Sequence, residues 1–245
     1  MFEDQREEEQ WALSDAQDHE FIPLISAEDE EAMQKEEVPE DLPLLSLRNT
    51  VLFPGVVIPI TVGRDRSIRL VKEAHKKDQR IGVVSQKNDD IEVPNGSDLN
   101  EVGTVAKVIK MLRMPDGSNT VILQGQKRFK WTEIVQEEPY MKARVMEYDA
   151  ENLPPKDDEH KALMESLKEL AIEIIQLSPN IPSEAGFAIK SIESLTFLVN
   201  FIGSNMNAPV EEKQTLLEVA GISLDAFQGS TPSVYGLTSR FLQAG

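Results

Sequence analysis

The chain contains no cysteine among its 245 residues, which excludes disulfide bonds and thiol chemistry. No uninterrupted apolar run approaches the roughly 18–20 residues that cross a membrane. The acidic N-terminus also lacks the basic and apolar pattern of a secretory signal. With a hydrophobic content of 40%, a chain of this length can still bury one or two cores. We therefore expect a soluble, cytoplasmic protein with no membrane partner.

Motifs for catalysis and for metal binding are missing as well. The sequence has neither the G-x-x-x-x-G-K-[ST] phosphate-binding loop nor the G-x-S-x-G nucleophile elbow. The three histidines, His19, His75 and His160, do not show the spacing of metal ligands. Adjacent carboxylates occur at Asp89-Asp90 and Asp157-Asp158, but such pairs in polar segments are usually helix caps or solvated charges. We expect no catalytic residue, metal site or cofactor here.

Acidic charge is concentrated at the N-terminus. Residues 1–40 hold 15 Asp and Glu against only Arg6 and Lys35, within a total net charge of −18. Such a segment repels itself and offers few apolar groups to offset the entropy of ordering, so we interpret it as a disordered acidic leader. The alternative is a short linear motif that docks onto a partner. Its apolar residues would be Trp11, Leu13, Phe21, Ile22, Leu24 and Ile25.

Residues 41–151 carry the periodicity of a β domain. Two apolar runs, 42–47 and 56–62, flank Phe53-Pro54-Gly55, where a fixed φ at Pro54 and the freedom of Gly55 predict a tight turn. Pro43 and Pro59 cannot donate to a ladder and indicate strand starts, edges or bulges. Helical spacing over 65–77, with Asp65 as a cap, predicts one crossover helix. Further strands are predicted at 81–86, 102–114, 120–126, 128–135 and 141–148.

The C-terminal half has the pattern of a helical bundle. Paired prolines at Pro154-Pro155 mark a linker over 152–158. Within 159–224 we predict three helices, the second capped by Ser183 and the third opened by Pro209 and closed by Gly221. Residues 225–245 are rich in Gly, Ser and Thr and are read as a flexible tail. The two lobes are expected to move about the linker unless a large apolar interface joins them.

Several separated segments together resemble one family. They are LPLLSLRNTVLFPGVVIPITVGRDRSI, EVGTVAKVIKMLRMPDGSNTVILQGQKRF, EEPYMKARV and VEEKQTLLE, which occur in this order between about 41 and 221. The series resembles the N-terminal domain of Lon, the ATP-dependent protease. The resemblance implies an α+β fold, with an N-terminal pseudo-barrel (PUA-like) β domain that contains one crossover helix, followed by a small α-helical bundle subdomain. The tail at 225–245 departs from the family.

The same resemblance implies a function. The family's ATP-driven motor, which uses ATP and Mg, and its peptidase with a serine and lysine dyad have no counterpart in this sequence, so we expect no enzyme activity. What remains is recognition of unfolded or damaged proteins, their delivery to the motor, and self-association in a homohexamer. The alternative is a stand-alone Lon-like substrate-binding protein that never had a motor.

Recognition of unfolded protein requires exposed apolar side chains. Alternation along 102–114 sends Val105, Ile109 and Met111 to one face and Val108, Leu112 and Met114 to the other. Both faces of this predicted strand therefore carry apolar side chains near the turn that follows residue 114. Flexible methionines suit a binder of many sequences. The candidate substrate-binding residues are Phe53, Pro54, Met111, Leu112 and Met114, with the alternative that these side chains only fill the barrel.

A different class of function is binding of RNA by a PUA-like module. Residues 115–119 are predicted to join the strands 102–114 and 120–126 as a hairpin. Basic residues cluster around this hairpin, with two aromatic rings, Phe129 and Trp131, available for stacking. This is the weaker alternative, because the basic residues alternate between faces and the globular part is still slightly acidic. The basic residues concerned are Lys107, Lys110, Arg113, Lys127, Arg128 and Lys130.

Overall fold

The computed structural model describes residues 32–33, 35–148, 158–177, 186, 189–190, 192–206 and 208–218. Several sequence predictions lie outside these residues. They are the leader before residue 32, the Pro154-Pro155 linker, the caps at Ser183 and Gly221, and the tail at 225–245.

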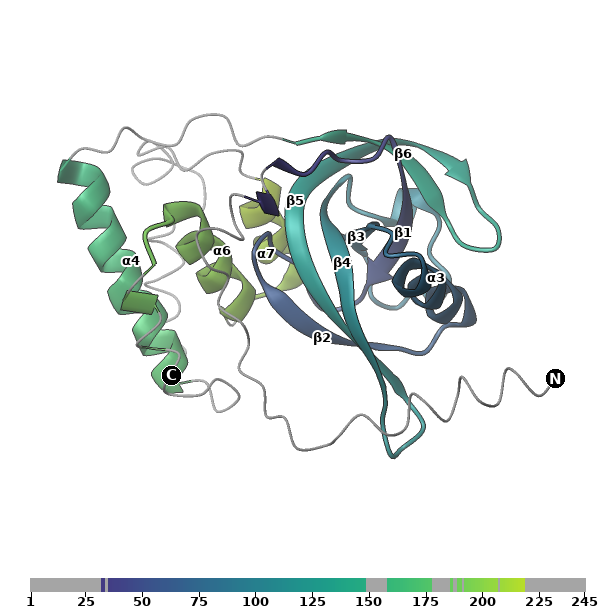
Figure 1. Ribbon diagram of the computed structural model, residues 1–245, viewed down its shortest axis with the longest axis horizontal. Helices are drawn as coiled ribbons and strands as arrows, with labels where there is room; N and C mark the ends of the chain where they lie inside the picture. Colours follow the sequence, from purple (N-terminus) through teal and green to yellow (C-terminus); the bar gives the residue numbers. More distant parts are fainter. Residues whose placement is uncertain are drawn as a thin grey trace.

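One mixed sheet of six strands forms the N-terminal lobe, in the order β2-β5-β4-β3-β1-β6. An additional pairing of β5 with β6 closes five of these strands into a ring, while β2 flanks the first part of β5. Figure 1 shows this barrel with α3 packed against one side. The strands are β1 (Asp41–Leu47), β2 (Val57–Val62), β3 (Ile81–Ser85), β4 (Val102–Arg113), β5 (Asn119–Gln136) and β6 (Lys142–Glu147).

Strand β5 pairs with both β2 and β6 along the same edge, through different parts of its length. Its residues 119–124 pair with β2, and its residues 129–136 pair with β6. The predicted strands 120–126 and 128–135 are therefore one continuous strand of 18 residues. Register shifts in β4 and β5 mark bulges, which bend strands and help a small sheet close on itself. The pseudo-barrel expected from the sequence is confirmed.

Helix α3 (Asp65–Lys76) makes the crossover between β1 and β3, which are parallel. A parallel pair requires such a crossover, so this prediction is confirmed. Its buried residues Leu70, Val71 and Ala74 cover the main core of the barrel. The cap is different from the prediction. Arg64 occupies the N-cap position without a side-chain hydrogen bond, and Asp65 is the first helical residue, where its charge complements the helix dipole.

The C-terminal lobe is helical, as predicted. Helices α4 (Asp158–Leu177) and α6 (Leu195–Asn205) share an apolar core, and α7 (Val210–Glu218) packs on α6 and on β4. Figure 1 shows α6 and α7 between α4 and the sheet. Ser194 caps α6 by accepting a hydrogen bond from the Phe197 amide at 3.1 Å. In the part of the chain that the structure describes, no helix has the length and apolarity to cross a membrane.

The turn at Phe53-Pro54-Gly55 does not join two paired strands. Strand β1 pairs with β3 and β6, whereas β2 pairs with β5 and lies at the end of the strand order. Gly55 has a φ of 78°, which confirms the positive φ predicted there. The turn is held against β5 instead. The Gly55 amide donates to the Gly125 carbonyl at 3.0 Å, and the Gly125 amide donates to the Val56 carbonyl at 2.9 Å.

Candidate functional site

The turn between β1 and β2 is the apolar anchor between the two lobes. Phe53 is 0% exposed and packs with Val102 of β4 and Leu217 of α7. A methyl group on Gly203 of α6 would lie 3.0 Å from the Phe53 ring. The expectation that Phe53 belongs to an accessible binding patch is therefore wrong, because the helical lobe covers its ring. Pro54 is half-buried at the same turn.

Buried polar contacts also join the lobes. The Ser85 hydroxyl donates to the side-chain oxygen of Gln214 at 2.6 Å, and the amide nitrogen of Gln214 donates to the Val102 carbonyl at 3.0 Å. Arg128 of β5 donates to Asn200 of α6 at 3.3 Å, and burial lowers the pKa of this arginine. Each contact satisfies polar groups that would be costly to leave unpaired. Together with Phe53 they oppose the lobe motion considered from the sequence.

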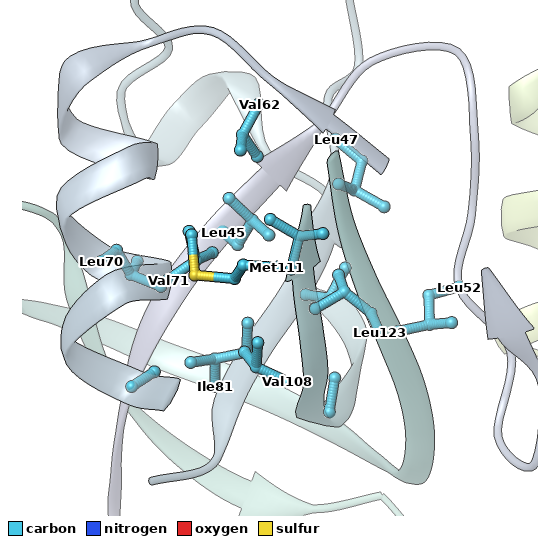
Figure 2. Close-up of a cluster of buried hydrophobic side chains, with 14 of the residues drawn as sticks. Leu45, Leu47, Leu52, Val62, Leu70, Val71, Ile81, Val108, Met111 and Leu123 are labelled. Carbon is cyan, nitrogen blue, oxygen red and sulfur yellow. The ribbon is translucent and has the colours of Figure 1, made fainter. Parts of the chain in front are cut away.

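At the other end of the barrel, Met111 does not line a surface. It is 7% exposed and lies in the core beneath α3 (Figure 2). The register explains why alternation assigned it wrongly. Val108 pairs with Leu123 and Lys110 pairs with Ile122, so Ile109 is an extra residue in a β-bulge. The bulge shifts the parity of the strand, and Val108 and Met111 consequently point to the same core.

The bulge turns a different set of side chains outward. Met111 pairs with Val121, and both are buried, so the flanking pairs Lys110–Ile122 and Leu112–Thr120 face away from the core. Ile109 is 44% exposed and Met114 is 41% exposed, whereas Leu112 and Ile122 are half-buried. We call this surface the outer hairpin face. It consists of Ile109, Lys110, Leu112, Met114 and Ile122.

This face projects from the barrel on a rigid support. Its two strands continue into the closed part of the sheet, and Figure 1 shows their turn extending beyond the other strands. Asp116 stabilises the turn by accepting hydrogen bonds from the Ser118 amide at 2.9 Å and from its hydroxyl at 2.7 Å. These bonds lower the pKa of Asp116. Gly117 supplies the positive φ that the turn needs. The arrangement displays apolar side chains at the tip of an ordered hairpin.

The basic residues around the hairpin do not form a phosphate groove. Lys127 pairs with Glu147 at 2.8 Å, and Lys130 pairs with Glu101 at 2.9 Å, a contact that raises the pKa of Lys130. Lys107 lies 3.4 Å from Asp78. Arg128 is buried between the lobes, and Phe129 is fully buried in the barrel. Acceptors within the protein therefore engage most of the groups that an RNA backbone would need.

Other candidate groups have structural surroundings. The Asp89 side chain accepts from the Asn49 amide at 3.3 Å, and the His75 ring lies 3.3 Å from the Val108 carbonyl. Among the residues described by the structure, no group of three or more His, Asp or Glu is placed to hold a metal ion. The outer hairpin face is thus the candidate site, and the chemistry it offers is apolar contact.

Residues 41–223 match the family model described as the ATP-dependent protease La (LON) substrate-binding domain. The chain belongs to this family. A Lon protease of Flavobacterium johnsoniae is 56% identical over 209 residues, which are 85% of this chain and 26% of that protein. A Lon protease of Cytophaga hutchinsonii is 50% identical over 206 residues, which are 84% of this chain and 25% of that protein. The chain thus spans about a quarter of the length of these curated relatives.

A solved structure supports the fold of this Lon domain independently. The N-terminal domain of a Lon protease from the Mycobacterium avium complex aligns with a TM-score of 0.58 at 17% identity. The alignment covers 83% of this chain and 96% of that one. At this identity the likeness concerns the fold alone, and it confirms the α+β architecture predicted from the sequence.

Proposed function

We propose that this chain is the recognition part of an ATP-dependent Lon-type protease and that it binds unfolded or damaged protein at the outer hairpin face. An unfolded chain differs from a folded one chiefly in its unburied apolar side chains, so its receptor needs apolar surface of its own. The observation that supports the proposal is the exposure of Ile109 and Met114 beside Leu112, on strands whose other face is core.

The chemistry of this face suits a receptor for many sequences. Leu112 and Met114 offer apolar contact without a fixed pattern of hydrogen bonds, and the flexible thioether of Met114 adapts to different partners. The ordered strands below restrict the loss of backbone entropy when a partner binds. Of the residues named from the sequence, Leu112 and Met114 remain in the proposed site. Met111 supports it from the core, whereas Phe53 lies at the lobe interface at the other end of the barrel.

The remaining parts of the function follow from family membership. We propose that the chain delivers bound segments to an ATP-driven motor, supports self-association in a homohexamer, and works in the cytoplasm. The anchored interface at Phe53 and Gln214 favours delivery by a domain that moves as one body, because separating its lobes would expose Val102, Leu217 and buried polar groups.

The proposal is tested by removing the apolar groups of the face. Leu112→Ser combined with Met114→Ser should weaken binding of a fluorescently labelled, permanently unfolded test protein about tenfold, because two apolar contacts are lost. Fluorescence anisotropy measures the affinity. The matched control is Val135→Ser combined with Met146→Ser, two exposed apolar residues on β5 and β6, which should leave the affinity unchanged. Equal affinities for wild type and the hairpin variant would disprove the site.

A further inference from the structure

The last residues of the acidic leader are fastened to the barrel. The carboxylate of Glu36 lies 2.6 Å from the Arg80 guanidinium and accepts a hydrogen bond from Gln126 at 2.7 Å. Val38 packs against the apolar cluster of the barrel that contains Phe129. The Glu40 carbonyl accepts a hydrogen bond from the Val145 amide at 2.8 Å. The residues before Glu36 therefore start from a fixed point on the barrel surface.

That fixed point adjoins the base of the outer hairpin face. Arg80, which holds Glu36, also lies 3.7 Å from Asp78, and Asp78 lies 3.4 Å from Lys107 on β4. Lys107 is half-buried between the core residues Ala106 and Val108, so it faces outward and precedes the exposed Ile109 by two positions. A chain leaving Glu36 is thus next to the strand that carries the face.

The leader is long enough to cover the face. At about 3.3 Å per residue, Met114 lies roughly 23 Å beyond Lys107 along the strand. Ala32, Met33 and Lys35 are helical, so only the 11 steps from Phe21 to Ala32 are counted as extended, and these span about 36 Å. The stretch between positions 21 and 25 can therefore reach every residue of the outer hairpin face while Glu36 stays bound.

The chemistry of the two surfaces is complementary. Residues 21–25 read Phe-Ile-Pro-Leu-Ile, and Glu20 and the acidic run 28–31 flank them. The face offers apolar side chains around Lys110. Within the described part of the chain, no carboxylate lies within ion-pairing distance of Lys110. An acidic segment with an apolar centre satisfies both the exposed apolar groups and this charge.

We propose that residues 20–31 dock in cis on the outer hairpin face and compete there with unfolded protein. The inference rests on the proposed function, because it regulates the same face. Because the leader is tethered beside the face, its effective concentration there is high. An unfolded protein must bind strongly enough to displace it, so only strong partners reach the face. The leader then acts as a selectivity filter, and raised ionic strength opens the face by weakening the charged contacts.

The absence of cysteine allows a direct test in the full chain. A bimane label is attached to Thr120→Cys, which lies opposite Leu112, and the quencher is introduced as Phe21→Trp. Docking should lower the bimane fluorescence about twofold relative to the same labelled protein with Phe21, because a docked population of roughly half quenches roughly half of the labels. The matched control is Thr215→Cys on the exposed side of α7, where Phe21→Trp should change nothing.

This experiment contains no unfolded protein, so it measures docking of the leader alone. Its result therefore does not depend on whether the face binds unfolded protein. Relief of quenching by Lys110→Glu or by 1 M salt, but not by Lys72→Glu on α3, supports docking at the face. Unchanged fluorescence at Thr120→Cys, or equal quenching at Thr215→Cys, overturns the inference. Quenching that disappears on dilution also overturns it, because the occupant would then be the leader of a second copy. The affinity for unfolded protein is a separate measurement.

Discussion

The two ends of the β4–β5 hairpin carry similar apolar side chains in opposite surroundings. At one end Val102 is buried by Phe53 and by Leu217 of α7. At the other end Ile109 and Met114 face solvent. The apolar content of the strands therefore does not mark the candidate site. The site lies where the helices stop covering the strands.

The two ends of the hairpin also differ in how closely the backbone is packed. At the covered end the Phe53 backbone lies so near Gly125 that any side chain there would collide with it. At the turn end an added methyl group on Gly117 would meet open space, and this position is restricted by its positive φ rather than by packing. Substitutions at the covered end should therefore change the free energy of unfolding, and substitutions at the outer hairpin face should change binding.

The largest expected effect is that of Phe53→Ala. The ring is fully buried between the lobes, so its removal should lower the free energy of unfolding by about 3–5 kcal/mol. Urea denaturation followed by circular dichroism measures this change. Phe53→Leu should recover more than half of the loss. A cost below about 1 kcal/mol for Phe53→Ala would mean that the ring is not buried at a lobe interface.

The second largest loss in the free energy of unfolding is expected for Gly125→Ala. A methyl group at this position would lie 2.2 Å from the Phe53 carbonyl oxygen, and the backbone must shift to accept it. We expect a cost of about 3 kcal/mol in the same denaturation experiment. Gly63→Ala is the matched control, because its added methyl group would meet nothing within 4 Å. Equal stability of the two variants would contradict the close approach of the turn to β5.

Asn200 tests the polar contact between the lobes. Asn200→Leu removes the acceptor that Arg128 uses at 3.3 Å and should cost about 1–2 kcal/mol, because the buried guanidinium loses a partner. Arg128→Met in the Asn200→Leu background should cost less than Arg128→Met alone. A double-mutant cycle on urea midpoints measures this coupling. Strictly additive effects would show that the two side chains do not interact.

A smaller effect concerns the dependence of stability on pH. The Tyr140 hydroxyl donates to Glu73 at 3.0 Å, and this bond, followed by that from Arg69, lowers the pKa of Glu73 below its ordinary value of 4.5. A lowered folded-state pKa adds stability above pH 4.5 that is lost as the pH falls through the folded value. The stability difference between wild type and Tyr140→Phe should therefore shrink below pH 4.5. A constant difference from pH 7 to pH 3 would contradict this assignment.

The smallest expected effect on stability is that of Met114→Ser. Because this side chain is exposed at the hairpin turn, the free energy of unfolding should change by less than about 0.5 kcal/mol. Affinity for unfolded protein should nevertheless fall in the anisotropy experiment. If Met114→Ser destabilises the fold as much as Asn200→Leu, the contrast between the two ends is wrong.

Local patterns in the sequence were sufficient for most of the fold. The β-branched runs, the crossover helix and the three-part helical lobe follow from periodicity and turn residues, and the family resemblance supplied their arrangement. The site was less predictable, because strict alternation cannot reveal an extra residue such as Ile109. A single bulge moved Met111 into the core.

The lobe interface was missed for a different reason. Phe53 looks the same in the sequence whether a helix covers it or solvent does, since the covering residues Gly203 and Leu217 lie more than 100 positions away. One signal was available. Asn200 stands inside the apolar run Leu-Val-Asn-Phe-Ile, where a polar side chain indicates a buried hydrogen-bonding partner.

The most direct test of the outer hairpin face uses methionines already in the chain. Peroxide oxidises exposed methionine faster than buried methionine, and mass spectrometry follows each residue. Met114 and Met146 are 41% and 54% exposed, whereas Met111 is 7% exposed. With saturating unfolded protein, oxidation of Met114 should slow severalfold, that of Met146 should be unchanged, and Met111 should stay slow throughout. Protection of Met146 without protection of Met114 would contradict the account.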